Sequence, residues 1–292
     1  MFKENVLEGK KILVTGGGTG LGKEMSKHYV QHGAEVVICG RRESVLAETA
    51  KEFKENYGAT VSYQPLDIRS PQDVEDFIDT IFQEGPLHGL VNNAAGNFIS
   101  PTKDLSPRGF DAIANIVFHG TFYVTNAVGK KWLEQKIKGS IISILATWVW
   151  TGSPFVVPSA MSKSALNTMT KSLAVEWGPS GIRINAIAPG PFPTEGAWAR
   201  LSPKGALDDS SSMTTIPMGR VGEMSELQNL ATFLMADGCE YLTGQTIALD
   251  GAQYLSGGGT FSQLSKMSEE DWSDIRAIIK KTNESDKKNR ST

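Results

Sequence analysis

The sequence predicts an α/β fold: one domain with a doubly wound parallel sheet and helices on both faces, followed by a C-terminal helical extension. Short apolar runs rich in Val and Ile alternate with helical patterns over most of the chain. A glycine-rich turn separates the first apolar run from the first helical pattern. No linker or internal repeat divides the 292 residues into two folded domains.

The composition is that of an ordinary globular protein. Hydrophobic residues make up 40% and charged residues 21% of the chain, and the formal net charge is −3. These values exclude a disordered protein and give no reason to expect a nucleic-acid partner. No run approaches the roughly 18 apolar residues of a membrane span, and no signal peptide is recognised, so cytoplasm is the expected location. Cys39 and Cys239 lack metal-ligand spacing, and no metal is expected.

The first strand is predicted over Lys11–Gly17 and the first helix extends to His32. Between them, Gly16 permits a tight turn, Gly20 permits close approach of a pyrophosphate, and Gly22 permits close packing of the helix on the sheet. Free amides at the helix N-terminus can bind the phosphates. The alternative is a flexible glycine loop. The turn predicts a Rossmann-type dinucleotide site with contacts from Gly16, Gly18, Thr19, Gly20, Leu21 and Gly22.

The second strand, Ala34–Gly40, ends in Arg41 and Arg42. An acidic residue at this place binds the ribose 2′-hydroxyl of NAD, whereas arginine suits the 2′-phosphate of NADP. The two arginines favour NADP(H), and the alternative is a solvated start of a helix.

The third and fourth strands complete the cofactor half. The third strand lies in VSYQPLDIRS, and Asp67 and Ile68, just past its end, are expected beside the adenine. The fourth strand is predicted over Gly89–Asn97, running into a small-residue turn, and Asn93 and Ala94 in this stretch are also expected to contact the cofactor. The later elements are predicted as helix Phe110–Gln135, strand Ile141–Leu145, helix Ser159–Trp177, strand Gly181–Gly190, helix Glu223–Met235, strand Gly244–Ala252 and helix Ser268–Thr282, with a disordered end after it. The domain is expected over residues 1–256, with a lid at about 192–216, and the extension over 257–292.

Several motifs together resemble the short-chain dehydrogenase/reductase superfamily up to about Ala252. They are TGGGTGLG, NNAAGN, APGP and the helical Lys163. The segments LVNNAAGNFISPT, FVVPSAMSK, LAVEWG and PGPFPTEGAWARL resemble its 2,4-dienoyl-CoA reductase branch, in which the usual catalytic Tyr is likewise replaced by Ser.

The superfamily's tetrad of Asn, Ser, Tyr and Lys is largely changed. Val117, Ala146 and Ser159 stand at the first three positions, and only Lys163 remains. A serine hydroxyl is far less acidic than a phenol, whose pKa is about 10. The pattern argues against alcohol–ketone chemistry. It permits hydride transfer to a conjugated thioester, whose oxygen needs hydrogen-bond donors more than it needs a phenol.

The resemblance implies four catalytic residues. Asn97 and Trp148 match the positions of the two oxyanion donors, although the family has Tyr at the second. An indole N–H can donate a hydrogen bond but cannot release its proton. Lys163 would hold the nicotinamide ribose hydroxyls, steered by Ser159 one helical turn earlier. The alternatives are that Trp148 is only an aromatic wall of the acyl pocket and that Lys163 is a solvated lysine.

The resemblance also implies the remaining contacts. Pro189, Gly190 and Phe192 would line the nicotinamide side of the cofactor. The positions that match contacts to acyl-CoA are Arg69, Phe98, Ser106 and Arg200. Each of these four could equally be ordinary surface or pocket lining. A homotetramer is expected from the family alone.

The sequence therefore predicts NADPH-dependent reduction of 2,4-dienoyl-CoA thioesters in fatty-acid degradation. One alternative is a short-chain reductase of another enoyl or keto substrate. The other is an NADPH-binding protein with little turnover.

Overall fold

The core of the protein is one parallel sheet whose carboxyl ends lie along the same edge. The computed structural model describes residues 3–59, 61–194, 215–257, 264 and 267–290. Within these residues the sheet has the order β3-β2-β1-β4-β5-β6-β7, and every neighbouring pair is parallel. The strands are β1 (Lys11–Thr15), β2 (Glu35–Gly40), β3 (Val61–Pro65), β4 (Gly89–Asn92), β5 (Ser140–Ile144), β6 (Arg183–Pro189) and β7 (Thr246–Leu249). The predicted doubly wound fold is confirmed, and the order reverses between β1 and β4, where such sheets open a ligand crevice.

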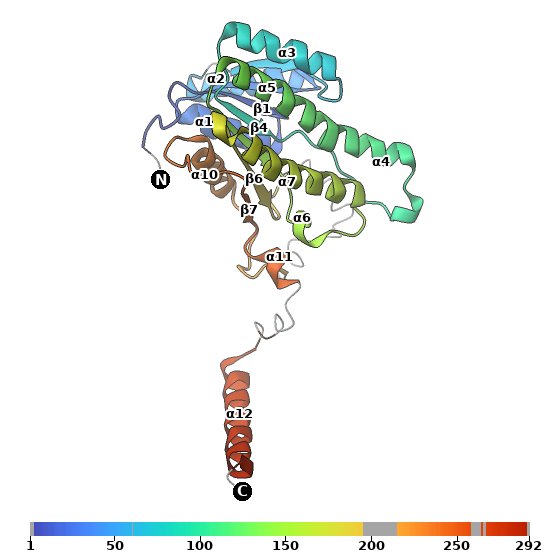
Figure 1. Ribbon diagram of the computed structural model, residues 1–292, viewed down its shortest axis with the longest axis vertical. Helices are drawn as coiled ribbons and strands as arrows, with labels where there is room; N and C mark the ends of the chain where they lie inside the picture. Colours follow the sequence, from blue (N-terminus) through green and yellow to red (C-terminus); the bar gives the residue numbers. More distant parts are fainter. Residues whose placement is uncertain (1–2, 60, 195–214, 258–263, 265–266, 291–292) are drawn as a thin grey trace. The chain divides into compact units, whose positions relative to one another are not determined.

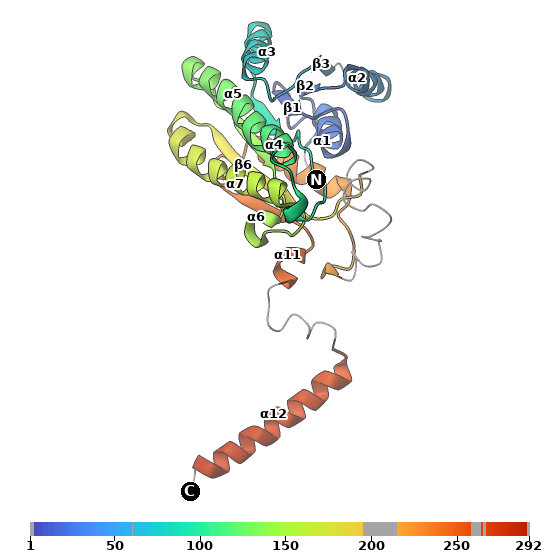
Figure 2. The ribbon, with the colours of Figure 1, turned by 90° about the vertical axis from the view of Figure 1, so that its right-hand side faces the viewer.

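Helices form a layer on each face of the sheet (Figures 1 and 2). One layer consists of α1 (Gly20–Gln31), α2 (Glu43–Tyr57) and α10 (Met224–Met235). The other consists of α3 (Pro71–Glu84), α4 (Pro107–Ala114), α5 (Thr121–Gln135) and α7 (Val157–Trp177). The strands are apolar on both sides because both faces are covered.

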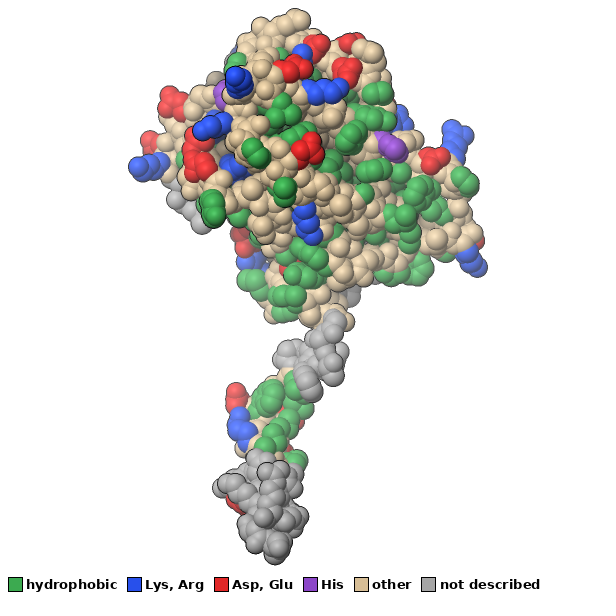
Figure 3. Space-filling model, viewed as in Figure 1, with side chains coloured by type: hydrophobic (Ala, Val, Ile, Leu, Met, Phe, Trp, Pro, Cys, Tyr) green, Lys and Arg blue, Asp and Glu red, His purple; other side chains and the backbone are tan. Residues whose placement is uncertain are grey.

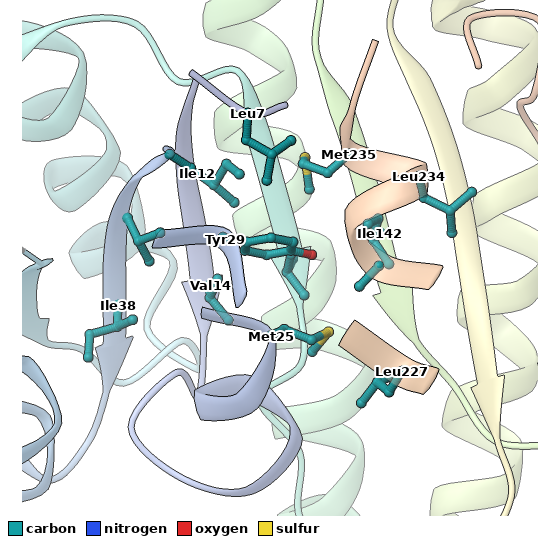
Figure 4. Packing of buried hydrophobic residues seen from close by; sticks show 14 of the residues in the cluster. Leu7, Ile12, Val14, Met25, Tyr29, Ile38, Ile142, Leu227, Leu234 and Met235 are labelled. Atoms are coloured by element: carbon teal, nitrogen blue, oxygen red, sulfur yellow. The ribbon is translucent and has the colours of Figure 1, made fainter. Parts of the chain in front are cut away.

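The layer of α1 and α10 packs tightly on the central strands (Figure 4). Tyr29 of α1 lies there with Met25, Ile12 of β1 and Met235 of α10, all at most 1% exposed. The Tyr29 hydroxyl has no hydrogen-bond partner within the described residues, and burial raises its pKa. The ring therefore stabilises this layer through packing alone.

The opposite layer positions α7, the helix that carries the candidate catalytic lysine. The Trp132 indole N–H of α5 donates to the Leu87 carbonyl at 2.8 Å. Trp177, near the end of α7, lies against Gly129 of α5, where a Cβ would stand 2.3 Å from the indole ring. The two helices approach closely because Gly129 has no side chain.

The helix predicted over Phe110–Gln135 contains a change of winding. It begins earlier, as α4, where the Ser106 hydroxyl accepts from the Gly109 N–H at 3.1 Å and caps the helix. A π-helical segment, η2 (Asn115–Gly120), joins α4 to α5 and contains the fully buried Val117. Such segments are rare and are frequent at functional sites. The sequence pattern did not indicate it, because side-chain periodicity shifts little over one turn.

Four short helices complete the secondary structure within the described residues. They are η1 (Thr102–Asp104), α6 (Trp148–Thr151), η3 (Gly178–Ser180) and α11 (Gln253–Ser256). The helices α6 and α11 follow β5 and β7 along the chain. Residues 148–151 were predicted to form a loop, and α11 was not predicted.

The chain divides into two compact units, Met1–Tyr254 and Leu255–Thr292. The second unit contains α12 (Glu269–Arg290). The helix was predicted to end at Thr282 and to be followed by disorder, and this was wrong for residues 283–290. The apolar stripe ends at Ile279, but the Lys, Glu and Arg residues after it are themselves favourable in helices. No helix of the described residues is long and apolar enough to span a membrane.

We expect Gly129→Ala to lower the free energy of unfolding by about 1–3 kcal/mol, measured by urea denaturation. Alanine normally favours a helix over glycine, but here the added methyl meets the buried Trp177 ring. Gly178→Ala is the control, because a Cβ there meets no atom within 4 Å. Equal stability of the two variants would show that the α5–α7 contact is not tight.

Candidate active site

The glycine turn after β1 is held against the end of β4. Gly16 has a φ of +66°, and a Cβ there would stand 3.0 Å from the Asn93 side chain. The Asn93 amide donates to the Thr15 and Gly16 carbonyls at 3.0 and 3.2 Å. At Gly22 a Cβ would lie only 2.4 Å from the Gly16 oxygen. The turn therefore requires glycine at both positions, and Asn93 fixes its shape.

The N-terminus of α1 is prepared for an anion. Its N-cap residue, Thr19, makes no side-chain capping bond, and the first turn of the helix has no acidic residue. The first amides of a helix have no intrahelical acceptor, and the helix dipole favours negative charge there. The pyrophosphate of a dinucleotide fits this end of α1.

A cavity of about 370 Å³ opens beside this turn. Its wall unites residues that follow four different strands, and most were predicted to contact the cofactor. They include Gly16, Gly18, Thr19, Arg41, Arg42, Asp67, Ile68, Asn93 and Ala94. Its volume is in the range of small-molecule sites. Leu21 is partly buried and packs into the core.

Both arginines at the end of β2 are exposed and line this cavity. Neither forms a salt bridge with another residue in the described part of the chain. A phosphate on the ribose next to β2 could therefore bind either guanidinium without displacing an existing carboxylate.

Asp67 and Arg69, which were assigned to different ligands, form an ion pair. The Arg69 Nε lies 2.9 and 3.0 Å from the two Asp67 carboxylate oxygens. The hydrogen bonds from Arg69 hold the Asp67 pKa below its usual range. Arg69 would have to share or leave this pair in order to bind a CoA phosphate.

The side chain of Lys163, a residue of α7, is buried against the carboxyl end of β5. Its side chain is 7% exposed, and its ammonium donates to the carbonyl oxygen of Ile144, the last residue of β5. Ser159, one turn earlier on α7, is 3% exposed. Burial lowers the Lys163 pKa to about 8. The alternative of a solvated lysine is thus wrong for this structure.

The loops carrying Asn97 and Trp148 meet over one apolar cluster. Phe98 and Val149, the residues after them, both pack on the cluster that contains Leu145 and Leu166. Leu166 lies on α7, three residues after Lys163. The fold therefore brings the two predicted oxyanion donors and the lysine helix to the same part of the crevice.

Each of the two donors has an N–H group available. The Asn97 Oδ1 accepts the Phe98 backbone N–H at 2.9 Å, which orients the amide and leaves its NH₂ to donate. Trp148 begins α6 and is partly exposed. No acceptor for its indole N–H is found among the described residues. Both groups can therefore donate a hydrogen bond to a ligand.

The other predicted contact residues lie in different surroundings: some at the end of β6, one in the core and one at the surface. Pro189 ends β6, and Gly190 lies against Asp250, whose Cβ would be 2.6 Å from a Cβ at Gly190. Phe192 is 7% exposed and its ring lies against Gly222, so it serves the core as well. Ser106 is exposed and caps α4. Arg200 and most of the predicted lid lie outside the described residues.

One feature of this edge was missed by the sequence analysis. The rings of Trp150 and Tyr254 stack with their centroids 4.6 Å apart. A contact between residues about a hundred positions apart leaves no periodic signal in a single sequence.

We expect Lys163 to give the free energy of unfolding a distinct pH dependence. Its pKa is about 8 in the fold and 10.5 ordinarily. Between these values the unfolded chain binds more protons, so the contribution of Lys163 to stability rises from pH 8 to 10.5, by up to about 3 kcal/mol. Urea denaturation of wild type and Lys163→Met at pH 7.5 and 9.5 measures the difference. The same pH dependence in both proteins would show that burial does not lower the pKa of Lys163.

Comparison with known proteins identifies relatives that match most of the chain. The family model for enoyl-(acyl carrier protein) reductase matches residues 16–252. A probable 2,4-dienoyl-CoA reductase of Caenorhabditis elegans, described as (3E)-enoyl-CoA-producing, is 41% identical over 286 residues, covering 96% of this chain and 92% of its own length. A probable 2,4-dienoyl-CoA reductase of Bacillus subtilis, described as (2E)-enoyl-CoA-producing, is 40% identical over 253 residues, covering 86% and 98%.

The fold is also that of a solved relative. The crystal structure of a short chain dehydrogenase from Bacillus anthracis superposes with a TM-score of 0.78 and 40% identity, covering 84% of this chain and 96% of that one. The chain therefore belongs to the short-chain dehydrogenase/reductase superfamily and to its 2,4-dienoyl-CoA reductase-like branch.

Proposed function

We propose that this protein is an NADPH-dependent reductase of 2,4-dienoyl-CoA thioesters and acts in fatty-acid degradation. The observation that carries the proposal is the pairing of a buried Lys163 with Ser159 where ketone reductases have a phenol. A site that keeps the lysine but has no acid at that position suits a substrate whose oxygen is stabilised and not protonated. The two dienoyl-CoA reductases at about 40% identity support this substrate class.

The chain's own residues would act on the thioester carbonyl and on its environment. A bound reduced nicotinamide would supply the hydride, and the δ-carbon of the diene would accept it. The Asn97 amide and the Trp148 indole N–H stabilise the oxygen of the dienolate that results. Lys163, whose ammonium donates to the Ile144 carbonyl at the end of β5, would hold the nicotinamide ribose hydroxyls. Buried positive charge near the dienolate also favours the transition state.

A proton must then reach the carbon chain, and Trp148 cannot supply it. Protonation at the α-carbon gives the 3-enoyl thioester, and protonation at the γ-carbon gives the 2-enoyl thioester. The two relatives carry different product descriptions, so similarity does not select between them. We propose that water delivers the proton to the α-carbon. The indole leaves no acidic group at the position where the family has a phenol.

Preference for NADPH over NADH would come from the arginines at the end of β2. Both line the cofactor cavity, and no acidic residue stands at that strand end to bind a ribose 2′-hydroxyl.

We expect the double variant Arg41→Ala, Arg42→Ala to bind NADPH roughly tenfold or more weakly, with NADH affinity changed less than about twofold. The reason is that only NADPH carries the 2′-phosphate. Titration of nicotinamide fluorescence measures both affinities. Arg108→Ala, an exposed arginine of α4, is the control. Equal loss of both cofactors would contradict the assignment.

We also propose a homotetramer. Hydrophobic side chains gather on the face of the molecule that carries α4, α5 and α7 (Figures 1 and 3). The large exposed ones on this helical layer are Phe118, Phe122, Leu133, Met161 and Val175. Exposed apolar surface of this kind is typical of contacts between subunits.

The proposed reaction is tested by following NADPH absorbance with trans,trans-2,4-decadienoyl-CoA. We expect saturable turnover by wild type and a loss of about a hundredfold or more in kcat/KM for Lys163→Ala and for Asn97→Ala. Lys171→Ala, an exposed lysine on α7, is the control. Trp148→Tyr should be faster by about tenfold, because a phenol can both donate a hydrogen bond and release its proton.

Three outcomes would contradict the proposal. Turnover of ketones but not of dienoyl-CoA would favour a reductase of another substrate. Activity found only in Trp148→Tyr would show that the present chain has lost the dienoyl substrate. NADPH binding without turnover in every variant would indicate a cofactor-binding protein.

A further inference from the structure

Two aromatic side chains from distant parts of the sequence meet at the carboxyl edge of the sheet. The Trp150 and Tyr254 rings stack with 4.6 Å between centroids and 25° between planes, a favourable aromatic geometry. Trp150 follows β5 and Tyr254 follows β7, while β6 lies between these strands. The pair therefore joins the segments that follow the two strands flanking β6, and the chain leaves β6 into Gly190.

Tyr254 is held in place by the turn after β7. The Asp250 carboxylate accepts the backbone N–H of Ala252 at 3.0 Å and of Tyr254 at 2.8 Å. Asp250 is 9% exposed and packs on Gly190 so closely that a Cβ there would stand 2.6 Å away. The position of Tyr254 is thus tied to the end of β6, on the predicted nicotinamide side.

Trp150 is held by the one-turn helix α6. Its backbone N–H donates to the Thr147 carbonyl at 3.1 Å, and the Gly152 N–H donates to the Trp148 carbonyl at 2.8 Å. Thr147 is buried. Trp148, the proposed donor to the thioester oxygen, and Trp150 therefore lie on the same short turn. The two indoles are two residues apart and leave the turn in different directions, so an acyl chain that contacts both must run along the turn.

The apolar surface near this turn remains open. Trp150 is still 41% exposed despite its stacking on Tyr254. Ile99 and Phe155, from the loops after β4 and β5, are also exposed, and the Ser100 N–H donates to the Phe155 carbonyl at 2.8 Å, which joins these loops. Large apolar side chains exposed together beside a site are a surface for an apolar ligand.

We propose that Trp150 and Tyr254 form an aromatic wall that contacts the distal carbons of the acyl chain and sets the chain length that the protein prefers. This inference rests on the proposed function, because it takes an acyl thioester as the ligand. Tyr254 positions Trp150 by stacking, and Trp150 presents its free surface to the chain. The shorter a chain is, the less of it reaches the wall.

The test uses full-length, NADP⁺-loaded protein and saturated hexanoyl-CoA and decanoyl-CoA, which bind without turnover. Isothermal titration calorimetry gives the ratio of the two dissociation constants. We expect wild type to prefer decanoyl-CoA, and Trp150→Ala and Tyr254→Ala to reduce that preference roughly fivefold or more. Trp150→Phe, which keeps an aromatic ring, should retain most of it. Tyr63→Ala removes an aromatic residue of matching exposure, 40%, from β3 and should change nothing.

The proposal of an aromatic wall would be overturned if wild type bound both thioesters equally. It would also be overturned if the alanine variants kept the wild-type ratio of dissociation constants. An increased preference for decanoyl-CoA would also overturn it, because the pair would then obstruct the chain. Failure of the proposed function has a different signature: wild type would bind neither thioester or would not oxidise NADPH with a dienoyl-CoA. Retained NADPH affinity shows that each variant is folded.

Discussion

The parallel direction of all the strands is the constraint on which the candidate site depends. Because every carboxyl end lies at one edge of the sheet, residues far apart in sequence meet there. Gly16 follows β1, Arg41 follows β2, Asn97 follows β4 and Trp148 follows β5. The buried ammonium of Lys163 on the Ile144 carbonyl attaches α7 to the same edge. Reversal of one strand would remove its residue from this edge.

The proposed reaction follows from the side chains at that edge, where Ser159 replaces the phenol of ketone reductases. Ser159 is buried one helical turn before Lys163, so the position at which ketone reductases have a phenol carries only a weakly acidic hydroxyl. Asn97 and Trp148, the proposed oxyanion donors, both carry N–H groups, which can stabilise an anionic oxygen without protonating it. Such a site is better suited to a dienolate than to the alkoxide formed from a ketone. This physical reading and the similarity to dienoyl-CoA reductases support the same substrate class.

Much of the fold and of the candidate site could be predicted from the sequence, because these parts depend on local patterns. The strands and the glycine turn follow from spacing within a few residues, and the place of Lys163 follows from the family resemblance. The π-helical turn at Val117 could not be predicted, since it changes winding without changing the apolar pattern. The ion pair of Asp67 with Arg69 depends on rotamers, and the stack of Trp150 on Tyr254 depends on the order of strands in the sheet. The end of α12 was misjudged because hydrophobic periodicity stops before the backbone helix does.

The most direct test of the account is the fate of isotopic label in a single turnover of 2,4-decadienoyl-CoA. The reaction would use NADPH deuterated at the transferred position in ordinary water, and then unlabelled NADPH in deuterated water, with the product analysed by mass spectrometry and NMR. The account predicts deuterium from the cofactor at the δ-carbon and deuterium from solvent at the α-carbon, in a 3-enoyl thioester. Cofactor label at the β-carbon would identify a simple enoyl reductase. Absence of cofactor label from the acyl chain would contradict the account entirely.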